Sequence, residues 1–171
     1  MKIILKIIDT ISEYSGRIFC WLAVILMLVF VFETTARYVF DSPTMWGYET
    51  SYMVGATMAV MGWSYTHKHH GHIRVDVIYT HLSLRAKAII DIVCSFLFLF
   101  PLLALLIHAA NASMLFALKL NERLMESAWR PPAAPIKMVV LAGISLFALQ
   151  CLAQFARDVY ALIRSKPYDT D

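Results

Sequence analysis

The sequence predicts an all-α integral membrane protein with four transmembrane helices and a short interfacial segment between the second and third helices. Hydrophobic residues make up 60% of the chain and charged residues only 16%, whereas soluble domains average about 25% charged residues. Mean hydropathy is +0.64. The apolar residues also gather into long blocks, in contrast to the period of 2 or 3.6 typical of soluble cores. We therefore expect one membrane domain that covers residues 1–171.

The first predicted span covers residues 17–38, because no polar residue lies between Ile18 and Phe32. A helix rises about 1.5 Å per residue, so this length crosses a bilayer core of about 30 Å. The second predicted span, residues 47–66, is less apolar and should face protein more than lipid. Its small residues recur every fourth position, which predicts a ridge for close helix packing, with chance spacing as the alternative. The ridge consists of Ser51, Gly55 and Ala59.

Residues 67–85 are too polar to span a membrane, and their scattered apolar residues suggest a segment that lies at the membrane surface. The third predicted span, residues 88–115, contains Pro101, which predicts a kink. The fourth predicted span, residues 136–160, follows a connection rich in proline. Proline fixes the backbone and cannot continue a preceding helix, so this connection should be extended or turning.

The distribution of basic residues predicts the orientation in the membrane. Four spans place both termini on one side, and ten of the fifteen lysines and arginines fall on that side. Because cytoplasmic loops carry the excess of lysine and arginine, we expect both termini to be cytoplasmic. The basic residues are spread over separate loops, so the net charge of +3 does not indicate binding to nucleic acid.

Two glutamates and one histidine in or near the predicted spans allow an alternative function in transport. Glu33 and Arg37 are four residues apart, which favours an ion pair on one helical face, although an ionisable residue within a span is also a functional candidate. A standalone small transporter or channel that uses Glu33, Glu49 or His108 is therefore the second hypothesis.

A membrane redox subunit that holds a metal or haem is the third hypothesis. Short spacing lets imidazoles converge on one ion, but no carboxylate or cysteine completes a zinc motif, so we expect the loop histidines to be solvated. These are His67, His69, His70 and His72. Haem needs axial histidines within the spans, where only His108 lies. The three cysteines lie singly in apolar blocks, and we expect buried thiols at Cys20, Cys94 and Cys151.

The sequence lacks the motifs that would indicate an enzyme. The sequence has no glycine-rich phosphate loop, nucleophile elbow or paired-carboxylate site, and its polar connections are too short to fold into a catalytic domain. We therefore expect neither a catalytic residue nor a cofactor.

One segment resembles a known family. The stretch from Arg37 through Val39, Phe40 and Pro43, followed by Trp46 and Glu49, is similar to the small, Q-type, four-helix membrane subunit of TRAP (tripartite ATP-independent periplasmic) transporters. Further matching stretches begin at Gly62 and at Glu126. They comprise Gly62, His72-Ile73-Arg74-Val75-Asp76, Leu82-Ser83-x-Arg85, Glu126-Ser127-x-Trp129-x-Pro131-Pro132 and Pro135-Ile136-Lys137.

The resemblance implies a bacterial inner-membrane complex that works as a secondary transporter. In such complexes a periplasmic binding protein delivers a solute, usually a carboxylate, to a large membrane subunit that holds the sodium and substrate sites. The small subunit belongs to the static scaffold, in contact with membrane lipids and with the large subunit. We expect packing against the large subunit by Glu33, Arg37, Trp46, Glu49, Ser51, Gly55 and Ala59. We expect periplasmic docking of the binding protein by Glu122, Arg123, Glu126 and Arg130.

Overall fold

A computed structural model describes residues 2–69 and 84–164 of the chain. The described residues form helices and no β-strand, apart from one isolated bridge between Arg123 and Pro132. The predicted all-α class is therefore confirmed. The elements are α1 (Lys2–Phe19), α2 (Leu22–Tyr38), α3 (Gly47–Lys68), α5 (Leu84–Cys94), the π-helical turn η1 (Ser95–Leu99), α6 (Phe100–Leu120) and α7 (Ala134–Arg164).

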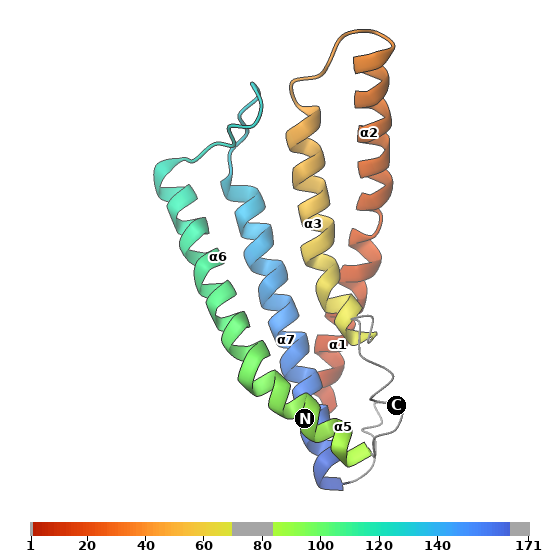
Figure 1. Cartoon of the computed structure of the whole chain (residues 1–171), viewed down its shortest axis with the longest axis vertical. Coiled ribbons are helices and arrows are strands. Elements are labelled where there is room, and N and C mark those ends of the chain that lie inside the picture. Colours follow the sequence, from red (N-terminus) through yellow and green to blue (C-terminus); the bar gives the residue numbers. More distant parts are fainter. Residues whose placement is uncertain (1, 70–83, 165–171) are drawn as a thin grey trace.

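Two helical hairpins pack side by side through α3 and α7 (Figure 1). Helix α2 contacts α3 on one side of this pair, and α6 contacts α7 on the other. The two helices approach closely at Gly143, where an added Cβ would collide with the Val60 side chain and lie 3.1 Å from its carbonyl group. The absence of a side chain at Gly143 thus lets the two central helices meet.

Three helical stretches in the described part of the chain are long and apolar enough to cross a membrane: Ile3–Tyr38, Ala86–Leu120 and Ala134–Ile163. Helix α3 has 22 residues and runs between α2 and α7, but it is not among these three, in line with its lower apolar content. A fourth crossing by α3 stays a prediction. The surface segment predicted for residues 67–85 lies mostly outside the described residues.

Helix α1 is an element that the sequence analysis did not anticipate. The helical stretch is interrupted at Cys20 and Trp21, so that α2 begins at Leu22 and a separate helix precedes it. The span predicted from the sequence, residues 17–38, left out most of α1 because this helix contains no long apolar block. It is amphipathic instead, and polar residues such as Ser12 and Ser15 are buried against the bundle.

The predicted irregularity at Pro101 takes the form of a π-helical turn. Proline lacks a backbone N–H, and its ring clashes with the carbonyl group four residues earlier. The turn Ser95–Leu99 comes just before it, and the Phe100 N–H donates to the carbonyl oxygen of Ser95. Together α5, η1 and α6 form one helical stretch from Leu84 to Leu120.

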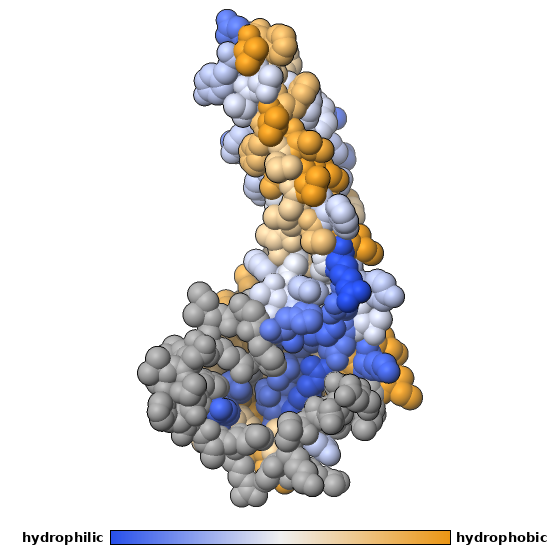
Figure 2. Space-filling view, turned by 90° about the vertical axis from the view of Figure 1, so that its right-hand side faces the viewer, coloured by the Kyte–Doolittle hydropathy of each residue, from blue (hydrophilic) through white to orange (hydrophobic). Residues whose placement is uncertain are grey.

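Apolar side chains cover much of the outer surface, and several polar ones lie inside. Helix α2 has no buried residue, although its sequence is almost entirely apolar. Figure 2 shows a largely apolar face above a hydrophilic band near one end of the molecule. Polar residues at most 1% exposed are Ser12, Glu49, Ser64 and Gln150. This distribution suits a bundle surrounded by lipid and protein partners.

The prediction of buried thiols holds for one cysteine only. Cys151 is buried in the bundle, but Cys20 and Cys94 are exposed on the chain, so the prediction for these two is wrong. An apolar membrane helix has an outward face that lipid or a partner covers, and an apolar neighbourhood in sequence does not reveal which face a thiol occupies.

Candidate functional site

The end of α2 is tied to the start of α3 by Glu33. Its Oε1 accepts a 2.7 Å hydrogen bond from Arg37, as the four-residue spacing predicted. Its Oε2 accepts from the hydroxyl group of Thr44 and, at 3.3 Å, from the Thr44 N–H. The Thr44 hydroxyl in turn accepts a 3.1 Å bond from the N–H of Gly47, where α3 begins. Glu33 therefore folds the first connection, residues 39–46, back onto the helix ends.

Trp46 and Gly47 complete this junction. The Trp46 ring stacks on Phe32 with centroids 5.7 Å apart and planes 20° from parallel. A Cβ at Gly47 would lie 2.6 Å from Glu33 Oε2 and 2.7 Å from Thr44 Oγ1, so only glycine leaves room for the carboxylate. Glu33, Arg37 and Trp46, which the sequence analysis assigned to a partner, thus make contacts within their own chain. Half of the Arg37 side chain, 52%, stays exposed.

Glu49 connects the start of α3 to the third connection, residues 121–133. Its Oε1 accepts a 2.9 Å hydrogen bond from the backbone N–H of Ser127. Glu49 is 1% exposed, and its Oε2 has no hydrogen-bond partner among the described residues. The position in the first turn of α3 is favourable for a carboxylate because the helix N-terminus carries partial positive charge. Glu49 therefore holds the middle of the third connection on the bundle.

The third connection has a defined shape of its own. The Leu124 N–H donates to the Pro131 carbonyl at 2.9 Å, and the Ala133 N–H donates to the Glu122 carbonyl at the same distance. These two bonds close a hairpin. Its tip carries Met125, which is 81% exposed, and Trp129, which is 49% exposed. Asn121, where α6 ends, and Arg130, at the end of the tip, adopt left-handed backbone angles with φ of 47° and 45°.

The four predicted docking residues all lie on this connection but differ in their surroundings. Glu122 pairs with Lys137 on α7, and the Arg123 guanidinium donates to the Arg130 carbonyl at 3.3 Å. Glu126 and Arg130 are exposed near the tip. Glu122 and Arg123 thus shape the connection, whereas Glu126 and Arg130 are presented at its surface.

The predicted ridge of small residues on α3 is partly exposed on the surface of this chain. The Ser51 hydroxyl bonds to its own helix at the Gly47 carbonyl, and Ala59 is exposed. A Cβ at Gly55 would meet Leu26 of α2 at 3.8 Å, which is ordinary contact. Tighter contacts involve Gly143, described above, and Gly16 of α1, where an added Cβ would collide with the Tyr65 ring. A lone glycine within a helix, apolar around Gly143 and amphipathic around Gly16, is the signal in the sequence that could have indicated these contacts.

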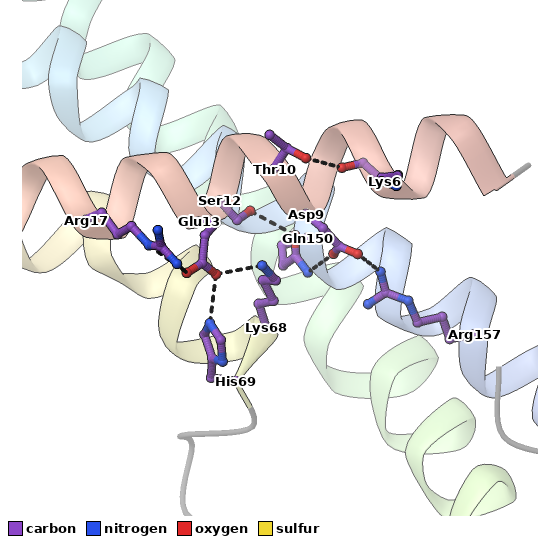
Figure 3. A network of polar contacts seen from close by, with 10 residues as sticks. All are labelled: Lys6, Asp9, Thr10, Ser12, Glu13, Arg17, Lys68, His69, Gln150 and Arg157. Atoms are coloured by element: carbon purple, nitrogen blue, oxygen red, sulfur yellow. Dashed lines mark hydrogen bonds and ion pairs between the residues drawn. The ribbon is translucent and has the colours of Figure 1, made fainter. Parts of the chain in front are cut away.

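A second polar layer lies at the opposite end of the bundle and holds α1 against α7 (Figure 3). Asp9 on α1 forms an ion pair with Arg157 on α7 and accepts a 3.1 Å hydrogen bond from the Gln150 amide. The Gln150 amide oxygen accepts a 2.8 Å bond from the Ser12 hydroxyl, and both residues are fully buried. Removal of any one of these groups would leave buried polar atoms without partners.

Glu13 joins α1 to the end of α3 in the same layer (Figure 3). One carboxylate oxygen pairs with Lys68 at 2.6 Å and with His69 at 2.9 Å, and the other pairs with Arg17 at 2.9 Å. The His67 ring instead packs edge-on against Phe147 at 5.5 Å. Within the described residues, no group of three or more His, Cys, Asp or Glu side chains is placed to hold a metal ion. His70 and His72 lie outside the described residues.

The residues of the second hypothesis do not form one cluster, because His108 lies on another helix than the two glutamates. His108 is exposed on α6, whereas Glu33 and Glu49 are engaged at the ends of α2 and α3 by the contacts described above.

The comparisons with known proteins agree with this architecture. A comparison with curated proteins found no match. The family model described as "Tripartite ATP-independent periplasmic transporters, DctQ component" matches residues 26–161, which include α3, α6 and most of α2 and α7. The match covers well over half of the chain and includes both connections fixed by Glu33 and Glu49. The chain therefore belongs to the DctQ family, the small membrane components of tripartite ATP-independent periplasmic transporters.

Proposed function

We propose that this chain is the scaffold subunit of a sodium-coupled secondary transporter that takes up a carboxylate-type solute delivered by a periplasmic binding protein. Family membership supports the role of a small transporter subunit. The sodium coupling and the solute class rest on the sequence resemblance. In this proposal the large membrane subunit holds the transport site, and the present chain stabilises it and helps to dock the binding protein.

The exposed apolar faces support the scaffold role. Helix α2 has no buried residue, and Ala59 of the small-residue ridge is exposed on α3. A membrane helix with small exposed residues allows a neighbouring helix to approach closely. The large subunit would therefore pack near Ala59, with the half-exposed Arg37 at the edge of the contact.

One observation carries the docking role: the buried carboxylate of Glu49 fixes the third connection in one shape. A loop that is already ordered loses little conformational entropy when a partner binds. Its tip presents the apolar Met125 and Trp129 beside the charged Glu126 and Arg130. Aromatic residues, methionine and arginine are enriched at the centres of protein interfaces. We place this tip on the periplasmic side, because the basic residues predict cytoplasmic termini and the described ends of α1 and α7 lie at the opposite end of the bundle (Figure 1).

Co-expression with the large subunit and the binding protein tests the proposal. We expect the chain to co-purify with the large subunit, and Trp129→Ala to weaken capture of the binding protein without loss of that assembly. Phe96→Ala, which changes an aromatic residue exposed on η1, away from both the tip and α3, is the matched control. Solute uptake by the chain alone into vesicles under an inward sodium gradient would contradict the scaffold role.

A further inference from the structure

Helix α1 carries an exposed apolar stripe that no contact within the described chain covers. Its members are 48% to 77% exposed. At 100° per residue they fall within about 100° of arc on one side of the helix. They are Ile3, Ile4, Ile7, Ile11, Tyr14 and Ile18.

The opposite side of α1 is the one that packs on α3 and α7, and it is rich in polar groups. Ser12 and Ser15 are buried there, and Asp9 reaches Arg157. A helix on the surface of a soluble protein has the reverse arrangement, with its apolar stripe turned inward. The isoleucines of α1 therefore require an apolar environment outside this chain.

The length of the helical stretch places α1 at a boundary of the membrane. The 36 residues of Ile3–Tyr38 measure about 54 Å at 1.5 Å per residue, which exceeds both the hydrocarbon core of about 30 Å and the whole bilayer of about 40–45 Å. Since α2 is the more apolar part and fills the core, α1 extends through the adjoining headgroup layer. Its stripe continues the exposed apolar surface of α2 through Ile18 and Trp21.

A cationic groove runs along α1 next to the stripe. The groove has a volume of about 310 Å³ and is lined by Lys6, Thr10, Arg17 and Lys68, together with Tyr14 from the stripe itself. Its two carboxylates, Asp9 and Glu13, are already engaged by the ion pairs described above. Lys6 makes no ion pair within the described part of the chain, and the Arg17 side chain is 70% exposed although it binds Glu13.

We propose that α1 binds acidic phospholipids of the cytoplasmic leaflet. Lipid phosphates lie in the groove beside Lys6 or beside Arg17, which are about 16 Å apart along the helix, and the acyl chains lie along the isoleucine stripe. An amphipathic helix with lysine or arginine beside its apolar face binds anionic membrane surfaces in two ways. Its apolar side chains are buried among the lipids, and its cations are attracted to the lipid headgroups. The proposal rests on the cytoplasmic orientation that is part of the proposed function.

The first test counts lipids on the full chain. The protein is purified without other subunits from vesicles of phosphatidylethanolamine and phosphatidylglycerol, and its bound lipids are measured by native mass spectrometry. Each removed cation should reduce phosphatidylglycerol adducts about fivefold, so Lys6→Gln and Arg17→Gln should each show this loss. Lys6→Arg should keep the adducts, because it preserves the charge. Lys119→Gln, which changes an exposed lysine at the other end of the bundle, should also keep them.

Equal adduct counts for Lys6→Gln, Arg17→Gln and Lys119→Gln would overturn the proposal. Because this measurement uses the chain alone, its outcome does not depend on whether the chain assembles with a large subunit. A failed co-purification would therefore count against the proposed function only.

The second test asks what covers the stripe. A spin label is attached at Ile11→Cys or at the neighbouring Thr10→Cys, with Cys20 and Cys94 changed to serine, and collisions with oxygen and with an aqueous nickel chelate are compared in vesicles. We expect the label at position 11 to favour oxygen and the label at position 10 to favour the chelate. Equal chelate access at both positions would place the stripe in water. Protection of position 11 from both reagents, in the chain alone or in the assembled complex, would show that protein covers it.

Discussion

The carboxylate of Glu49, on the first turn of α3, accepts a 2.9 Å hydrogen bond from the backbone N–H of Ser127, 78 residues later in the chain. This contact joins the helical hairpin of α2 and α3 to the connection between α6 and α7. It lies at the same end of the bundle as the Glu33 junction (Figure 1). Each of the two connections is thus held to the bundle by a carboxylate near a helix end.

Replacement of Glu49 by alanine should loosen the third connection. The Ser127 N–H would lose its acceptor, which costs about 1–3 kcal/mol of stability for a buried group. Glu49→Gln keeps an amide oxygen in the same place and should retain most of that stability. Hydrogen exchange of residues 121–133 in the purified protein, together with capture of the binding protein, measures the effect. Glu126→Gln, at an exposed site on the same connection, is the control, and unchanged exchange in Glu49→Ala would show that the contact does not hold the loop.

A side chain at Gly143 should separate the two central helices. An added Cβ meets both the side chain and the backbone of Val60, so Gly143→Ala forces a shift that costs about 1–3 kcal/mol. Gly62→Ala is the matched control, because no atom lies within 4 Å of its added Cβ. There we expect equal or slightly higher stability, since alanine favours a helix over glycine by about 0.5–1 kcal/mol. Thermal unfolding in detergent compares the two variants, and equal melting temperatures would argue against close packing of α3 and α7 at Gly143.

Arg37→Ala should weaken assembly with the large subunit more than it alters solute affinity. Arg37 supports the Glu33 junction at 2.7 Å and is half exposed beside it, so its loss disturbs the surface offered to a partner. Arg37→Lys keeps a positive charge near Glu33 and should assemble better than the alanine variant. Yield of the co-purified complex and the KM for uptake separate the two effects. A changed KM with intact assembly would place Arg37 in the transport path.

The Asp9 and Arg157 side chains should prove energetically coupled. Both are largely buried, and they connect α1 to α7 across 148 residues of sequence. In a double-mutant cycle with Asp9→Asn and Arg157→Gln, the coupling energy should be about 1–3 kcal/mol. Unfolding in detergent at fixed pH provides the free energies. The exposed pair Arg17 and Glu13 offers a comparison on the same helix. Additive effects of the two substitutions would mean that α1 is held by its other contacts.

The sequence predicted most of the helices and one contact of the Glu33 junction. Long apolar blocks predicted the helical stretches, the four-residue spacing predicted the Glu33–Arg37 pair, and Pro101 predicted the irregularity that η1 provides. It did not reveal α1, which buries Ser12 and Ser15 together with Leu5 against the bundle and exposes five of its six isoleucines. It also did not predict the contact between Glu49 and Ser127, because nothing local indicates that the carboxylate turns towards that residue.

The all-helical membrane architecture and the DctQ family follow from the sequence by itself, because apolar length and short motifs are properties of contiguous residues. Only the tertiary structure decided how each helix is rotated about its axis. That rotation sets which glycine meets a neighbour, here Gly143 and Gly16, and which polar side chains reach partners more than a hundred residues away, as Asp9 reaches Arg157. Such pairings depend on the packing of whole helices, so the order of residues within any one helix does not specify them.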